Sequence, residues 1–207
     1  MKKVLLFAFV ALFACTITAQ QVNFGAKAGV NFASIGGDET EEWDGKTGFH
    51  LGLISEILLS EKFAFQPEIL YSSQGAKAEG TETFEGITAS YEAKLKLDYV
   101  NIPLLAKYYI SPNFNIHVGP QLGFLVKSEG EAEYSFMGES ETETEDLKDD
   151  TKGVDFALAA GLGYKLEMGL FFEARYNLGL SNIWDYEDED DFSQKNNVIQ
   201  LSVGFMF

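Results

Sequence analysis

Four charged side chains stand on the polar sides of strongly alternating segments: Glu68, Lys107, Glu173 and Arg175. If these two cations and two carboxylates lined a water-filled path, they could select or gate the ions that pass through it. Away from water they would pair with one another, because a buried charge is stable only when it is paired. The elements that position these residues decide between an ion path and an ion-pair plug.

The two histidines, His50 and His117, fall at opposite ends of their segments, so we expect neither a shared metal site nor a catalytic dyad. The acidic run 185–191 offers the carboxylate oxygens that Ca²⁺ prefers, but its spacing matches no EF-hand loop. No nucleophile elbow, phosphate loop or Cys/His metal spacing is present. The sequence therefore predicts no catalytic residue, no metal site and no cofactor, and favours a protein that is not an enzyme.

The composition narrows the class of partner. The chain has 207 residues and a net charge of −17, which argues against nucleic acid, because phosphate binding needs clustered Lys and Arg. Its 18 Phe and 9 Tyr argue against disorder, since disordered acidic chains contain few aromatic residues.

Residues 1–19 have the pattern of a cleaved secretory signal. Lys2 and Lys3 precede an apolar stretch over 4–14, and Ala19 supplies a small residue near the expected cleavage point. About 11 apolar residues are too few for a membrane helix, which needs roughly 20. Cys15 leaves open a lipoprotein cleavage box, which the bulky Phe13 fits poorly. The expected mature domain is residues 20–207.

From residue 22 onward the dominant period is two, which indicates β-strands. The clearest segment is the last, in which one face reads Ile199, Leu201, Val203, Phe205 and Phe207. The alternating segments are 23–32, 49–59, 63–72, 95–110, 114–127, 153–167, 169–181 and 198–207. In the fourth segment the apolar phase slips, which a β-bulge near Asp98–Tyr99 or two separate short strands would explain.

The connections alternate in length. Tight turns at 60–62, 111–113 and 167–169 alternate with long polar loops expected at 34–47, 75–93, 128–152 and 183–196. The four loops hold 25 of the 32 acidic residues, which we interpret as a solvated surface. Short and long connections in turn are typical of an up-and-down barrel whose rims face different compartments. Both termini would then lie on the periplasmic side.

Alternation alone does not say which face is inside. An apolar interior would give a soluble, lipocalin-like periplasmic carrier, whereas an apolar exterior would give a membrane barrel. The polar face favours the membrane barrel because it is rich in Gly and Ala, as a narrow interior requires, and because its charges balance. These charges are Lys27, Lys107, Lys127, Lys165 and Arg175 against Glu56, Glu68, Asp155 and Glu173. The apolar face also gathers aromatic residues near both strand ends, as membrane barrels do.

Three stretches resemble the PorT-like outer-membrane β-barrel domain family, a group of small porin-family proteins. They are residues 98–108 with the following 119–123, the opening residues 24–31, and the terminal Phe207. The resemblance implies an outer-membrane location in a Gram-negative cell. It also implies that the assembly machinery reads Phe207 at the end of the last strand.

The sequence thus predicts an all-β, eight-stranded antiparallel transmembrane barrel with short periplasmic turns and long acidic external loops. Eight-stranded interiors are just filled by side chains, so a plugged lumen with a structural or surface-binding role is expected. A narrow porin or small-solute-binding barrel is the alternative. The expected partners are outer-membrane lipid and lipopolysaccharide, with any further external partner left open.

Overall fold

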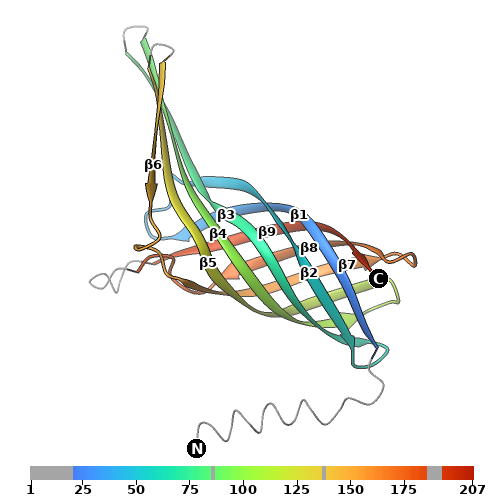
Figure 1. The fold of residues 1–207 in the computed structure, drawn as a ribbon. Helices are drawn as coiled ribbons and strands as arrows, with labels where there is room; N and C mark the ends of the chain where they lie inside the picture. The colour runs from blue at the N-terminus through green and yellow to red at the C-terminus, as the bar shows by residue number, and fades with distance from the viewer. Residues whose placement is uncertain (1–20, 85–86, 137–138, 186–192) are drawn as a thin grey trace, which may run out of the picture.

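A computed structural model describes residues 21–84, 87–136, 139–185 and 193–207 (Figure 1). The expected signal peptide, with Cys15 inside it, and most of the acidic run 185–191 lie outside these residues. No helix in the described part of the chain is long and apolar enough to cross a membrane.

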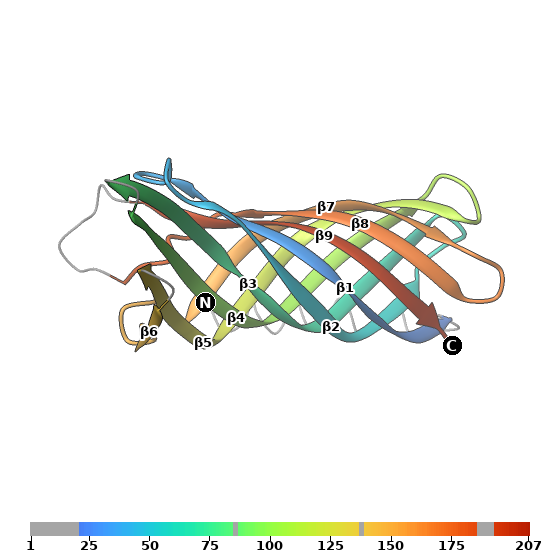
Figure 2. The ribbon, with the colours of Figure 1, turned by 90° about the horizontal axis from the view of Figure 1, so that it is seen from above.

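The described residues form nine antiparallel strands. Eight of them close into a ring in the order β1, β2, β3, β4, β5, β7, β8 and β9, and β6 pairs only with β5 (Figures 1 and 2). The predicted closure is confirmed, because Gly25 of the first strand lies opposite Met206 of the last. The strands are β1 (Val22–Gly37), β2 (Asp44–Leu58), β3 (Phe63–Phe84), β4 (Ile87–Tyr109), β5 (Phe114–Phe136), β6 (Glu139–Asp146), β7 (Val154–Lys165), β8 (Leu170–Gly179) and β9 (Gln194–Met206).

The apolar face of the ring points outward. On β8, Tyr176 is 45% exposed, while its neighbour Arg175 is 2% exposed and points into the lumen. Paired rings lie near both strand ends, with Phe63 and Tyr108 centroids 5.0 Å apart at the short-turn end. This polarity is wrong for a soluble lipocalin-like carrier, which would bury its apolar face, and it confirms the membrane-barrel orientation.

Small residues let the lumen close. At Gly52 a Cβ atom would lie 2.0 Å from the backbone oxygen of Ile69 on the neighbouring strand. No side chain fits in that space. The close approach of the two strand backbones around the narrow interior therefore requires glycine at this position.

Two of the four expected loops are in fact strand. β3 and β4 continue through most of 75–93, and β5 and β6 fill much of 128–152. They form a narrow four-stranded sheet that rises from the end of the barrel opposite the C-terminus (Figures 1 and 2). The loop prediction was wrong here because it relied on apolar alternation, whereas backbone pairing with a neighbouring strand needs none. We call residues 77–84, 87–96, 129–136 and 139–146 the projecting sheet.

The predicted irregularity at Asp98–Tyr99 is confirmed, but its location differs in detail. Asp98 lies opposite Lys127 and Tyr99 opposite Leu125, so Val126 of β5 is the extra residue. The phase slip on β4 has a separate cause, because its odd positions face inward on both sides of the bulge. They are all apolar or aromatic at the projecting-sheet end, at Leu95, Leu97 and Tyr99, and become mixed further along, where Asn101 and Lys107 alternate with Leu105.

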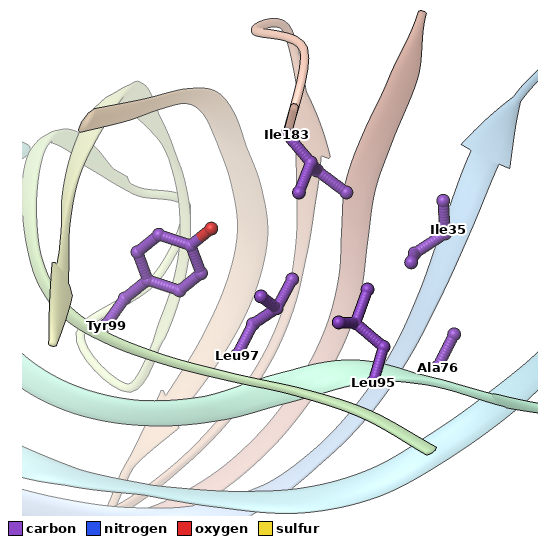
Figure 3. Packing of buried hydrophobic residues seen from close by; sticks show 6 residues of the cluster. All are labelled: Ile35, Ala76, Leu95, Leu97, Tyr99 and Ile183. Atoms are coloured by element: carbon purple, nitrogen blue, oxygen red, sulfur yellow. The ribbon is translucent and has the colours of Figure 1, made fainter. Parts of the chain in front are cut away.

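An apolar cluster fills the lumen at the projecting-sheet end. Leu95, Leu97 and Tyr99 point inward from β4 and pack with residues from other parts of the ring (Figure 3). Because these side chains are almost wholly buried, they close this end of the barrel. We call the set the apolar plug; it comprises Ile35, Ala76, Leu95, Leu97, Tyr99 and Ile183.

Candidate functional site: the closed lumen

A four-residue ion cluster crosses the middle of the lumen. Arg175 of β8 donates two hydrogen bonds to Glu68 of β3, at 2.9 and 2.7 Å. Four strand positions separate β3 from β8 in either direction around the ring of eight, so this pair joins opposite walls. Lys27 of β1 lies 2.9 Å from Glu68 and 2.8 Å from Glu173, and Arg175 also contacts Glu173 at 2.8 Å.

The cluster is balanced in charge and excluded from solvent. Two cations meet two carboxylates, and none of the four side chains is more than 3% exposed. The bidentate geometry of the arginine–carboxylate pair gives direction as well as attraction. Each of the four charges has a partner of opposite sign, while the buried Arg175 Nε atom has no hydrogen-bond partner. A neutral group of this kind can hold the walls together, and it offers a passing ion no unpaired charge.

A second cluster lies nearer the short turns. Glu56 accepts from Lys107 at 2.8 Å and from the Tyr109 hydroxyl, and Lys165 lies 3.5 Å away. Gln66 connects the two clusters, because it accepts from Lys107 and donates to Glu68, each at 2.7 Å. Lys165 on β7 and Glu56 on β2 again come from opposite walls.

The sequence prediction of the central cluster needs two corrections. Lys107 was expected there, but it pairs with Glu56, and Lys27 takes its place. Lys127 was expected in the lumen, but it is exposed and pairs with Glu129 at 2.7 Å. The bulge at Val126 explains this second error, because one extra residue reverses the inward and outward positions that follow it on β5.

Both histidines lie in the lumen, as predicted, but in different networks. His50 contacts the Asn31 Oδ1 atom at 2.7 Å and the Ser202 hydroxyl at 2.8 Å. His117 has its Nε2 atom 3.8 Å from a Glu173 carboxylate oxygen and so borders the central cluster. In the described part of the chain, no group of three or more His, Cys, Asp or Glu side chains could hold a metal ion.

The Ser202–His50–Asn31 arrangement has the hydrogen-bond order of a nucleophile, a base and an orienting amide. The serine and histidine come from different strands, so their sequence spacing gives no hint of it. The three residues are 7%, 1% and 0% exposed. A substrate carbonyl would have to reach the serine through the packed lumen, so the arrangement is suited to bracing three neighbouring strands.

The projecting sheet carries the acidic residues in ordered positions. Glu139, Glu141, Glu143 and Glu145 alternate along β6, whose residues are all exposed. On β5, Glu131 pairs with Lys96 of β4, and this contact holds the pKa of the Glu131 carboxyl below its ordinary range. This cross-strand pair shows how the sheet offsets part of its own negative charge.

A known protein family matches most of the chain. The outer membrane protein β-barrel domain matches residues 18–185. No curated protein matches the chain in sequence. Among solved structures, the chain is similar to the attachment invasion locus protein Ail of Yersinia pestis, at 16% identity over 90% of this chain and 99% of that one, with a TM-score of 0.46.

Two further solved structures are similar in fold. One is Neisserial surface protein A, at 10% identity over 90% of this chain and 99% of that one, with a TM-score of 0.48. The other is OprG from Pseudomonas aeruginosa, at 14% identity over 91% and 97%, with a TM-score of 0.40. Because the domain match covers most of the sequence and the strands close into a ring with an apolar exterior, the chain belongs to the outer membrane protein β-barrel domain family and is an integral outer-membrane protein.

Proposed function

We propose that this protein is a non-conducting barrel that anchors the projecting sheet as a binding surface outside the cell. The observation that carries the proposal is the Arg175–Glu68 pair, which joins opposite walls of the ring with no exposed side-chain surface. The apolar plug gives the lumen a second closure beyond it. An ion would have to break both to cross.

Planar-bilayer recording tests the closed lumen. The full mature chain should add no steady channel openings to a bilayer, whereas regular unitary steps would refute the proposal. The Glu68→Gln, Glu173→Gln double variant is the informative comparison, because it leaves two lumen cations without their carboxylates. If the ion pairs close the lumen, the double variant should show new channel openings and the parent protein should show none.

A narrow porin or small-solute-binding barrel is the second candidate. It is favoured by a set of buried lumen amides, which in the described residues have side-chain atoms without a hydrogen-bond partner: Asn101, Gln121, Asn177, Asn196 and Gln200. Polar atoms of this kind could contact a small uncharged solute. Liposome swelling with sugars of increasing size distinguishes this candidate, since a closed barrel gives no swelling.

We further propose that the protein has no catalytic activity, because the serine–histidine contact formed by the described residues, between Ser202 and His50, is buried in the lumen. A fluorophosphonate probe should leave Ser202 unlabelled in folded protein, and labelling there would overturn the proposal.

The motif residues around 98–108 support placing the chain in the PorT-like group of outer-membrane barrels.

The proposed membrane orientation rests on the alternation of short and long connections, and the proposed assembly role of Phe207 rests on the same resemblance. We propose that the short turns and both termini face the periplasm and that lipopolysaccharide surrounds the opposite rim. Phe207 is 78% exposed, and its backbone nitrogen donates to Phe24 at the barrel seam, so its ring is open to the assembly machinery. The Phe207→Ala variant should lower the amount of heat-modifiable barrel in membranes, and an unchanged amount would count against this role.

A further inference from the structure

A cavity of about 650 Å³ lies where the projecting sheet meets the barrel. Trp43, just before β2, and Trp184, after β8, both line it, and Leu95 and Leu147 add aliphatic surface. We call it the tryptophan pocket. Its volume lies within the range of small-molecule sites, and such sites are mostly apolar with a few placed polar groups.

The pocket is held in place by contacts that do not involve a ligand. The Trp184 indole nitrogen donates to the Gln194 side chain at 2.7 Å, and the Trp184 backbone forms a bridge with Thr151. Leu147 is fixed by its backbone nitrogen, which donates to Ser128 at 3.0 Å. Both tryptophans and Leu147 pack against the apolar plug but are only partly buried, so part of each side chain stays accessible from the pocket.

One side of the pocket is acidic. Glu143 and Glu145 of β6 lie opposite Ala132 and Gly130, and directly opposed residues of antiparallel strands share a face of the sheet. Both glutamates line the pocket and are exposed, and no ion pair with another described residue engages either of them. The one cation of the lining, Lys94, is already paired with Glu92 at 2.8 Å.

We propose that the tryptophan pocket binds an amphipathic cation. An aromatic or alkyl group would lie against the two indole rings, and an ammonium group would lie near Glu143 and Glu145. Indole faces attract cations through their quadrupole, and the attraction grows where water is excluded. The inference deepens the proposed binding role of the projecting sheet and depends on that end of the barrel facing outside the cell.

Trp43 and Trp184 are the only two tryptophans in the chain, so intrinsic fluorescence reports on the pocket. The full mature protein in zwitterionic nanodiscs would be titrated with benzyltrimethylammonium chloride. Benzylsulfonate keeps the ring and reverses the charge, and tetramethylammonium keeps the charge and removes the ring. We expect a saturable fluorescence change with the first probe and none with the other two.

The strand itself offers a matched control. Glu143→Gln with Glu145→Gln should weaken benzyltrimethylammonium about 5- to 10-fold, as loss of local charge partners predicts. Glu139→Gln with Glu141→Gln removes the same charge from the same strand and face beyond the pocket, and it should change the affinity less than about 2-fold. Both variants must first show the heat-modifiable gel shift of the parent.

Three results would overturn the proposal: no saturable response in the parent protein, an equal response to benzylsulfonate, or equal weakening by the two double variants. These failures differ from failure of the closed-barrel proposal. A barrel that conducts could still bind the cation, and a closed barrel could leave the fluorescence unchanged.

Discussion

The central ion cluster yields the sharpest stability prediction. The Lys27→Met variant removes one cation and leaves Glu68 and Glu173 to share Arg175, which places one uncompensated negative charge in the lumen. Removing one partner of a buried ion pair costs about 3–5 kcal/mol, and the full burial of these side chains places this site in that range. Adding Glu173→Gln restores neutrality and keeps the bidentate Arg175–Glu68 pair.

We therefore expect the double variant to be less destabilised than the Lys27→Met single variant, a coupling of about 1–3 kcal/mol. Unfolding in urea would be followed by tryptophan fluorescence and by the heat-modifiable gel shift. The Lys127→Met variant is the matched control, because its exposed pair with Glu129 should contribute at most about 1 kcal/mol. If Lys27→Met costs no more than this control, the lumen charges are solvated and the closed-lumen argument fails.

Three further predictions concern other parts of the barrel. The Gly52→Ala variant should destabilise folding by about 1–3 kcal/mol through overpacking, whereas Gly153→Ala, with no atom near its added Cβ, should be neutral in the same urea titration. Lys96→Met should raise the pKa of Glu131 toward its ordinary value in an NMR titration, because the hydrogen bond from Lys96 is what lowers that pKa in the folded protein. The pair stabilises the folded state above the depressed pKa, and this stabilisation is lost as the pH falls through it. An unchanged titration would contradict the pairing. A membrane-impermeant amine reagent on intact cells should modify Lys127, as mass spectrometry of peptides would show, and protection would place it in the lumen or on the periplasmic side.

Sequence reasoning predicted the barrel well because its signal is local. In a barrel strand, successive side chains point alternately to lipid and to lumen, so the polarity of each residue predicts its side, as it does for Arg175 and Tyr176. Short turns then make consecutive strands neighbours in the sheet. The same reasoning failed at 75–93, where the strands continue beyond the closed ring into the projecting sheet. There the apolar contrast disappears while the backbone hydrogen bonds continue.

The lumen contacts were harder to predict for a different reason. The charges that face inward could be read from alternation, but Arg175 meets Glu68 across the ring, so their contact depends on strand number and stagger. The single-residue bulge at Val126 moved Lys127 outward, and no feature of the sequence placed the extra residue on β5. Likewise, Trp43 and Trp184 are 141 positions apart, and only the packing at the barrel mouth brings them to one pocket.

The sequence by itself therefore determined the strand periodicity, the order of short turns and the balance of inward charge, since each depends on residues close together in the chain. The tertiary structure alone decided which charges pair, which end the apolar plug closes and where the polar strands continue as the projecting sheet. Those features depend on contacts across a closed ring, where the distance between two side chains is set by the barrel's geometry and only weakly by their separation in sequence.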